Sequence, residues 1–283
     1  MPEVRLQGGP ADGLALNYLA EGRGPTVVLV HGLGGFAASW RRTAEALAAR
    51  GTVYAIDLPG FGRSAKPRAR YGLEFFADAL HGFLVALGLG PASLVGHSLG
   101  GAVAVTYALK HPARVDRLAL LGVLVPGFSY RLAPALRVLA VRGLGEALAL
   151  GGCRPVYRAA LARCFHRPVH EELDFLIDCD YAARTAWDAR LAYLATLRGV
   201  RAEFEERGPA YRRALGTLDV PVLMIHGRQD PVVPAAHCAE LAAALPRART
   251  RWLEACGHFP QLEHAAVVNE WLGDFLVGRP APR

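Results

Sequence analysis

The chain has very few lysines: among its 32 basic residues only Lys66 and Lys110 are lysine, and the others are arginine. The net charge is nevertheless +7, a value that on its own would suggest a nucleic-acid partner. The arginines are scattered, since no basic run exceeds two residues and no basic segment is interleaved with aromatic residues. This distribution argues against nucleic-acid binding, and we expect a small-molecule substrate instead.

The chain also lacks a regular cysteine pattern. An odd number of cysteines at irregular spacing fits neither a disulfide framework nor a zinc site, so we expect reduced thiols and no metal. No stretch reaches the roughly 18 apolar residues of a membrane span, and no basic segment precedes an apolar one as in a signal peptide. We therefore expect no membrane span and a cytoplasmic location. The five cysteines are Cys153, Cys164, Cys179, Cys238 and Cys256.

The length of 283 residues suits one large α/β domain with an insertion or two small domains, and the 52% of apolar residues is enough for a sizeable core. Short apolar runs alternate with amphipathic segments, which predicts a mostly parallel central sheet with helices on both faces. The predicted strands are 26–30, 52–56, 93–95, 117–123, 220–225 and 250–253, and the predicted helices between and after them are 40–50, 75–87, 235–245 and 265–276.

The alternation stops between residues 126 and 218, where the pattern is mostly helical. The clearest predicted helices there are 136–150 and 185–204. We interpret this stretch as a helical cap inserted into an α/β core that consists of residues 1–125 and 219–283.

The most informative motif is Gly96-His97-Ser98-Leu99-Gly100, which stands between a predicted strand and an amphipathic segment. A G-x-S-x-G segment in this context is typical of a nucleophile elbow, in which the serine occupies a strained turn and its hydroxyl is exposed above the sheet. The glycines are needed because a side chain would clash at such a turn.

A serine hydroxyl needs a base to remove its proton, and the base needs a third group to orient it. Asp230 follows the strand 220–225, and His258 follows the strand 250–253. Both positions fall at carboxyl ends of strands, where active sites of parallel sheets gather. The order Ser98, Asp230, His258 is the one associated with this elbow, so we predict a catalytic triad.

The tetrahedral intermediate of such a reaction needs hydrogen-bond donors for its oxyanion. We predict that the backbone N–H groups of Leu33 and Leu99 supply them, because one opens the helix after the elbow and the other lies in the glycine loop after strand 26–30. His31 and His97 are interpreted as structural.

The motifs H-G-L-G-G-F (31–36), D-L-P-G-F-G-R-S (57–64), G-H-S-L-G-G (96–101), H-G-R-Q-D (226–230) and C-G-H-F-P-Q-L-E (256–263) together resemble the α/β-hydrolase fold family. The resemblance covers nearly the whole chain except the cap. It implies a hydrolase of the serine esterase type that uses no cofactor. Ser98 separates the chain from the haloalkane dehalogenase and epoxide hydrolase branches, which have an aspartate at the elbow.

Hydrolysis of a carboxylic ester with a small to medium apolar acyl or aryl group, through an acyl-enzyme, is the first expectation. The alternative is hydrolysis of a carbon–carbon bond in a ring-cleavage diketone acid, because residues 256–269 look like the histidine region of that group. Arg190 in the cap would then bind the substrate carboxylate, and Phe128 and Phe259 are candidate pocket residues. His97, Phe259 and a glycine loop without G-P-G depart from that group's pattern.

Three other assignments stay open at this stage: a thioesterase, a perhydrolase and a non-catalytic receptor on the same fold. An intact triad argues against the receptor. The sequence also leaves the oligomeric state open, with a homodimer as one candidate.

Overall fold

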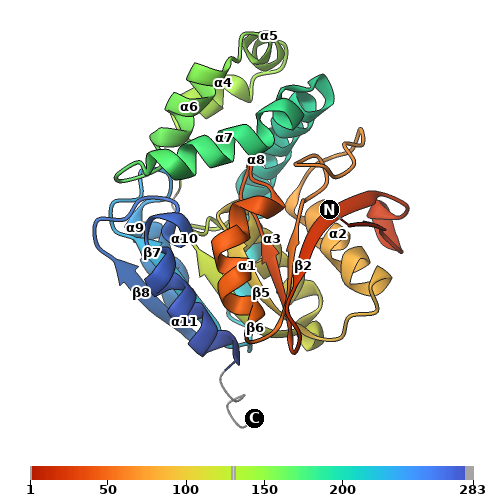
Figure 1. Ribbon diagram of the computed structural model, residues 1–283, viewed down its shortest axis with the longest axis vertical. Coiled ribbons are helices and arrows are strands. Elements are labelled where there is room, and N and C mark those ends of the chain that lie inside the picture. Colours follow the sequence, from red (N-terminus) through yellow and green to blue (C-terminus); the bar gives the residue numbers. More distant parts are fainter. Residues whose placement is uncertain (1, 129, 131, 278–283) are drawn as a thin grey trace.

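The predicted strands lie side by side in one eight-stranded sheet that has helices on both faces (Figure 1). The structure is a computed structural model that describes residues 2–128, 130 and 132–277. The strand order is β1-β2-β4-β3-β5-β6-β7-β8; the pairs β1–β2 and β2–β4 are antiparallel, and all pairs from β4–β3 to β7–β8 are parallel. The fold class predicted from the sequence is therefore confirmed. The strands are β1 (Glu3–Arg5), β2 (Ala15–Glu21), β3 (Thr26–Val30), β4 (Thr52–Ile56), β5 (Ala92–His97), β6 (Val115–Leu121), β7 (Val222–Gly227) and β8 (Ala248–Leu253).

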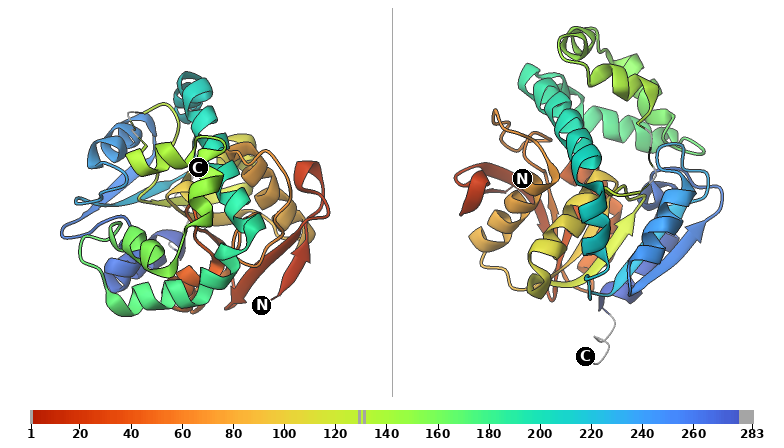
Figure 2. Two further views of the ribbon diagram at one scale, coloured as in Figure 1. Left: turned by 90° about the horizontal axis from the view of Figure 1, so that it is seen from above. Right: turned by 180° about the vertical axis from the view of Figure 1, so that it is seen from behind.

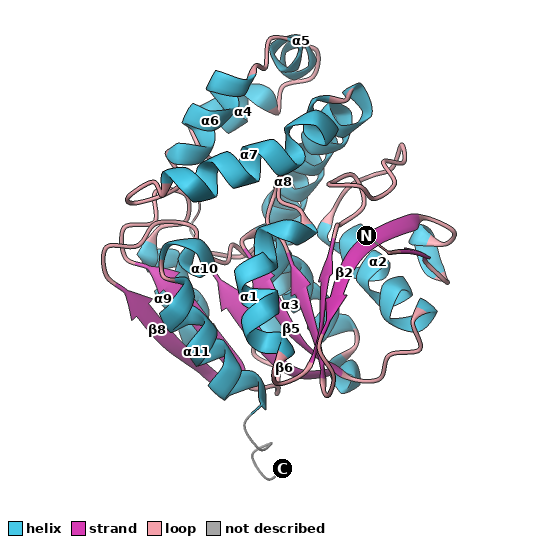
Figure 3. Ribbon diagram, viewed as in Figure 1, coloured by secondary structure: helices cyan, strands magenta, loops and turns pink. Residues whose placement is uncertain are grey.

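The central strands are buried on both faces, which explains why they read as continuous apolar runs. In β3, Val28 and Val30 face the cluster beneath α2 and α3, whereas Val27 and Leu29 face the cluster beneath α1 and α11. This two-residue alternation places the sheet between two helical layers (Figure 3). The core helices are α1 (Arg41–Ala48), α2 (Leu73–Ala86), α3 (Leu99–Lys110), α9 (Ala235–Ala244), α10 (Pro260–Glu263) and α11 (Ala265–Val277), with 3-10 turns η1 (Gly9–Ala11), η2 (Ala37–Trp40) and η3 (Pro112–Arg114).

Helices from the predicted cap lie together above one end of the sheet, and α5 forms the outermost tip (Figures 1 and 2). The long helix α8 runs from this group down into the core, where Leu215 is fully buried. Among the helices that the structure describes, none is both long and apolar enough to cross a membrane. The cap helices are α4 (Pro134–Leu139), α5 (Leu144–Leu150), α6 (Arg154–Ala162), α7 (His170–Thr185) and α8 (Trp187–Leu215).

The predicted helix 136–150 is wrong as a single element, because it is divided into α4 and α5. Gly143 has a φ of +78°, a conformation that favours glycine and interrupts a helix. At this break Arg198 of α8 donates hydrogen bonds to the carbonyl oxygens of Ala140 and Val141. The turn between the helices is therefore fixed by a residue more than fifty positions away.

Candidate active site

Ser98 stands on a sharp turn between β5 and α3. Its φ is +51°, one of only two positive values among the non-glycine residues that the structure describes. A Cβ on Gly100 would lie 2.2 Å from the carbonyl oxygen of Val30, and one on Gly96 would lie 2.5 Å from that of Gly100. Only glycine fits at these two positions, so the strained turn of Ser98 is held by its surroundings. Ser98 is half-buried, while Gly96, His97, Leu99 and Gly100 around it are buried.

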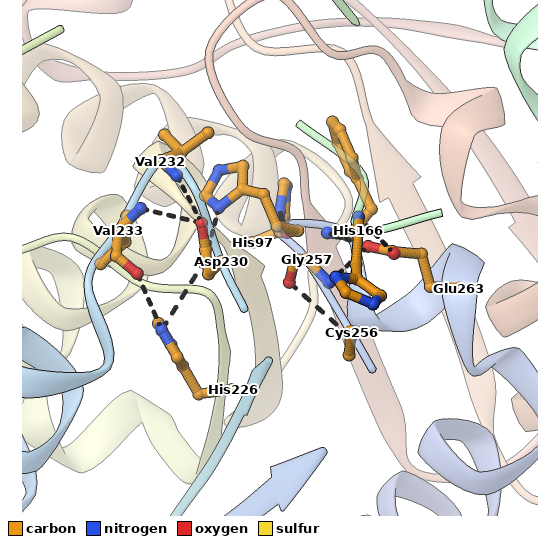
Figure 4. Close-up of polar contacts among 11 residues, drawn as sticks. His97, His166, His226, Asp230, Val232, Val233, Cys256, Gly257 and Glu263 are labelled. Atoms are coloured by element: carbon orange, nitrogen blue, oxygen red, sulfur yellow. Dashed lines mark hydrogen bonds and ion pairs between the residues drawn. The ribbon is translucent and has the colours of Figure 1, made fainter. Parts of the chain in front are cut away.

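Asp230 and His258 form a hydrogen-bonded pair, as the sequence predicted for an acid and a base. His258 Nδ1–H donates to Asp230 Oδ2 at 2.8 Å, and both residues are buried. The other carboxylate oxygen accepts hydrogen bonds from the backbone N–H groups of Val232 and Val233, at 2.7 and 2.9 Å (Figure 4). Burial would raise the pKa of Asp230, but His258 and these donors outweigh it and leave the pKa below its usual value. Asp230 is therefore held as a carboxylate.

Ser98 and His258 border the same turn at the end of β6. The Ser98 N–H donates to the carbonyl oxygen of Leu121, and a Cβ on the next residue, Gly122, would lie 3.2 Å from His258 Nδ1. Within the described part of the chain, Ser98 Oγ makes no hydrogen bond. Catalytic hydrogen bonds are often long in a free enzyme and shorten when substrate binds, so this arrangement suits a serine hydrolase without substrate.

His97 supports the backbone of the catalytic loop. Its Nε2–H donates to the carbonyl oxygen of His258 at 2.7 Å, and its ring lies 4.8 Å from the His258 ring and 5.0 Å from that of Phe259. Burial, together with the nearby His258, lowers the pKa of His97 to about 3. His97 therefore stays neutral and keeps a second positive charge away from His258.

Glu263 connects the loop of His258 to the cap by hydrogen bonds. Its carboxylate accepts hydrogen bonds from the N–H groups of Gly257 and Phe259 in the loop, and from that of His166 in the segment between α6 and α7 (Figure 4). The His258 N–H donates to the carbonyl oxygen of Cys164 in that segment, at 2.8 Å. The backbone of the predicted base is thus held partly by cap residues. The sequence motif 256–263 contained Glu263, but it gave no sign of this contact.

The predicted oxyanion donors lie on either side of the serine. Leu99 opens α3 directly after Ser98, and a Cβ on Gly32, which precedes Leu33, would lie 3.1 Å from Ser98 Cβ. Neither the Leu33 N–H nor the Leu99 N–H has a hydrogen-bond partner among the described residues. Both donors are therefore free to receive an oxyanion.

Arg184 of α7 is a cap arginine that contacts the glycine loop of the core. Its Nη1 donates to the carbonyl oxygen of Gly34 at 2.7 Å and to the hydroxyl of Tyr157 at 2.9 Å. The guanidinium lies 4.2 Å from the ring centre of Tyr157 and 5.2 Å from that of Tyr193. Asp180, one turn earlier, is its nearest acidic partner at 4.0 Å. Nothing in the sequence distinguished Arg184 from the other cap arginines.

Arg190, the residue we expected to bind a carboxylate, has different partners. Its guanidinium donates to the carbonyl oxygens of Thr185 and Ala149, and so ties the start of α8 to the end of α5 within the cap. Arg184, and not Arg190, donates a hydrogen bond to the glycine loop, and the sequence pattern could not tell which side of α7 and α8 faces the core. Of the two predicted pocket aromatics, Phe259 lies 5.6 Å from the His258 ring, whereas Phe128 packs against His237 and Arg212 in the core.

A model of the alpha/beta hydrolase family matches residues 27–271 of this chain. The chain is similar to the 2-hydroxymuconate semialdehyde hydrolase of Pseudomonas sp. strain CF600, with 33% identity over 284 residues that cover 94% of this chain and 92% of the relative.

Among solved structures, the chain is similar to the 2-hydroxy-6-oxo-6-phenylhexa-2,4-dienoate hydrolase of Rhodococcus sp. strain RHA1, with a TM-score of 0.80 and 28% identity over 97% of this chain and 98% of that one. An esterase from Exiguobacterium antarcticum has a TM-score of 0.81 and 20% identity, over 97% of this chain and 98% of that one. The esterase likeness concerns the fold alone.

Proposed function

This chain belongs to the alpha/beta hydrolase family, and within that family we propose that it hydrolyses a carbon–carbon bond in a ring-cleavage keto acid. The sequence analysis ranked ester hydrolysis first and this reaction second. The relatives reverse that order, because the similar proteins carry the names of hydrolases of 2-hydroxymuconate semialdehyde and of a 2-hydroxy-6-oxo-dienoate. Such substrates have a carboxylate at one end and a carbonyl group at the other.

Arg184 is the observation that carries the proposal. Its side chain is only 25% exposed, and Asp180, the acidic partner found for it among the described residues, is 4.0 Å away. A cation withdrawn from water favours close pairing with an anion, and a guanidinium suits the two oxygens of a carboxylate. Ionised Asp180 is itself costly in this setting, since burial raises its pKa to about 6. A substrate carboxylate would give the Arg184 guanidinium a close anionic partner.

The glycine loop sets the distance between Arg184 and Ser98. Gly32 borders Ser98, and a Cβ on Gly34 would lie 2.5 Å from the Arg184 guanidinium. Two residues of chain span at most about 7 Å. An elongated acid held by Arg184 therefore extends along the loop toward Ser98, with its far carbonyl group near the hydroxyl.

The proposed reaction uses the triad predicted from the sequence. Ser98 Oγ attacks the ketone carbon while His258 accepts its proton and Asp230 stabilises the imidazolium. The oxyanion receives hydrogen bonds from the Leu33 and Leu99 N–H groups. The carbon–carbon bond then breaks, His258 returns the proton to the departing carbon, and water hydrolyses the acyl-enzyme.

Ester hydrolysis remains the second candidate because of two residues beside the base. His97 and Phe259 stand where the carbon–carbon hydrolase pattern has asparagine and tryptophan, and the two rings pack on each other and on His258. The same triad and oxyanion donors would cleave an ester without any role for Arg184.

The two reactions are separated by comparing kcat/KM for a coloured 2-hydroxy-6-oxo-dienoate with that for a series of p-nitrophenyl esters. We expect the dienoate to be turned over much faster than every ester. Arg184→Gln should raise KM for the dienoate about 10- to 100-fold, the usual effect of losing a hydrogen bond to a charged group. It should change KM for neutral esters far less, because the contact of Arg184 with the Gly34 carbonyl oxygen acts on kcat for both kinds of substrate. Arg190→Gln is the matched control and should leave the dienoate-to-ester ratio unchanged. Faster turnover of an ester, or an equal effect of both variants, would reject the proposal.

A further inference from the structure

The outer surface of the cap tip is apolar. Among described residues, ten large apolar side chains are exposed, and six of them lie within residues 138–156. On α5 the exposed residues Leu144, Ala147 and Leu148 follow helical spacing, so one face of this helix points away from the protein. We call this surface the tip patch. Its six large members are Val138, Val141, Leu144, Leu148, Leu150 and Val156.

The tip patch is surrounded by positive charge that the chain does not balance. Between residues 132 and 158 the sequence contains four arginines and a single acidic residue, Glu146. Glu146 is already bound by both terminal nitrogens of Arg198. Arg137 and Arg142, which adjoin Val138 and Val141, are exposed and have no hydrogen-bonding or ionic partner among the described residues.

The other two arginines on this side are compensated. Arg154 and Arg158 of α6 form ion pairs with Asp178 and Asp174 of α7. The charge of the tip patch therefore comes from Arg137 and Arg142, beside the apolar side chains rather than beneath them. Trp187 opens α8 one turn before Arg190, which binds the end of α5, and it is 47% exposed there.

We propose that the tip patch docks on an anionic lipid surface. Apolar side chains next to arginines are the composition of helices that lie in a membrane interface, and an aromatic residue at the border is common there. The tip is also the part of the cap farthest from the sheet (Figure 1), so it meets a flat surface before any other part does.

A second copy of the chain fits this surface less well. In a two-fold dimer the same patch faces itself, so Arg137 and Arg142 would oppose the same two arginines with no acid available. An anionic bilayer instead supplies negative charge to each of them. The inference concerns where the protein sits and does not depend on the reaction it catalyses.

The test is co-sedimentation of the full chain with vesicles of phosphatidylcholine alone or with phosphatidylglycerol added. We expect binding to the anionic vesicles that weakens as salt is added. Arg137→Gln with Arg142→Gln should lower the partition coefficient about 30-fold, from the usual contribution of an arginine near such a surface. Arg213→Gln with Arg249→Gln removes the same charge from exposed positions at the end of α8 and on β8, away from the tip patch, and should have little effect.

Leu144→Gln with Leu148→Gln tests the apolar part, with Val85→Gln and Val267→Gln on the core as the matched control. Circular dichroism confirms that each variant is folded. The proposal is overturned if the wild-type chain does not bind anionic vesicles, or if the core variants lose as much binding as the tip variants. It is equally overturned if the leucine variant converts a dimer to a monomer without weakening vesicle binding, because the patch would then be a contact between copies.

Discussion

Asp180 is a buried carboxylate whose ionisation works against the fold, and replacing it with asparagine should reveal this as a change in pH dependence. The residue is 4% exposed in α7. Burial raises its pKa from 3.8 to about 6, although Arg184 and Lys66 oppose the rise and Asp57 adds to it. The attraction of Arg184 at 4.0 Å therefore does not offset the loss of hydration.

The sign and size follow from the two pKa values. The folded state holds the Asp180 proton more tightly than the unfolded chain, so protonation stabilises the fold. That stabilisation is complete below about pH 4 and is lost as the pH rises through about 6. A difference of about two pH units corresponds to about 3 kcal/mol. Asparagine cannot ionise, so the Asp180→Asn variant should gain about this much relative to wild type between pH 4 and pH 7.

The assay is urea denaturation of both proteins at several pH values, in which the difference in unfolding free energy is followed rather than either value alone. An effect of the substitution that does not depend on pH shifts this difference equally at every pH, so only its change with pH is interpreted. Asp174→Asn, on the same helix but with a side chain 54% exposed, is the matched control and should give a nearly flat difference. A flat difference for Asp180→Asn as well would show that burying this charge has no net cost and would refute the reasoning.

Four further outcomes are expected. Ser98→Ala should leave less than about 1% of wild-type turnover with an unchanged melting temperature, and a fluorophosphonate should label wild-type Ser98; clear residual activity or labelling only at another residue counts against the nucleophile. Glu263→Gln should lower kcat more than KM, because it loosens the backbone of His258 rather than the pocket; stopped-flow binding that weakens in parallel with kcat would contradict this. Gly100→Ala should destabilise the fold by several kcal/mol in thermal unfolding, since its Cβ would lie 2.2 Å from the Val30 oxygen, and an unchanged melting temperature would reject that steric argument. Incubation with EDTA should leave turnover unchanged, whereas loss that zinc restores would reject a metal-free mechanism.

The parts of the molecule that could be predicted from the sequence are those determined by residues close together in the chain. The strands 26–30 and 52–56 were predicted with the bounds that the structure has, because each is a short apolar run between turn residues. The elbow at Ser98 needs only glycines within a few positions. Asp230 and His258 could be named because each follows a strand, and parallel strands end at one edge of the sheet.

The parts that could not be predicted depend on contacts between distant segments. The strand β2 (Ala15–Glu21) has apolar residues without a strict two-residue alternation, and its place beside β4 is set by antiparallel pairing. In the cap, Arg184 and Arg190 lie six residues apart in similar alanine-rich surroundings. The choice between them depends on how α7 and α8 pack on the core, which the sequence pattern does not contain. The division into a core of 1–125 and 219–283 and a cap of 126–218 stays a prediction; α8 ends at Leu215, inside the second boundary, although this end of the helix is buried in the core.

Contacts from the cap hold the two loops that carry His258 and Leu33. The segment Cys164–His166 holds the loop of the proposed base, through the His258 N–H and Glu263. Arg184 holds the glycine loop that carries Leu33. A cap displaced as one body would thus move the base and an oxyanion donor together.

The cap is also anchored to the core outside the site. Glu172 of α7 is 1% exposed and pairs with Arg41 and Arg42, at 2.9 and 2.6 Å. Among the described residues, the side chains that join the α4–α5 tip to the rest of the chain by hydrogen bonds are instead Arg190 and Arg198 of α8, within the cap itself. Binding at the tip can therefore shift α4 and α5 without breaking a contact that orients His258 or Leu33.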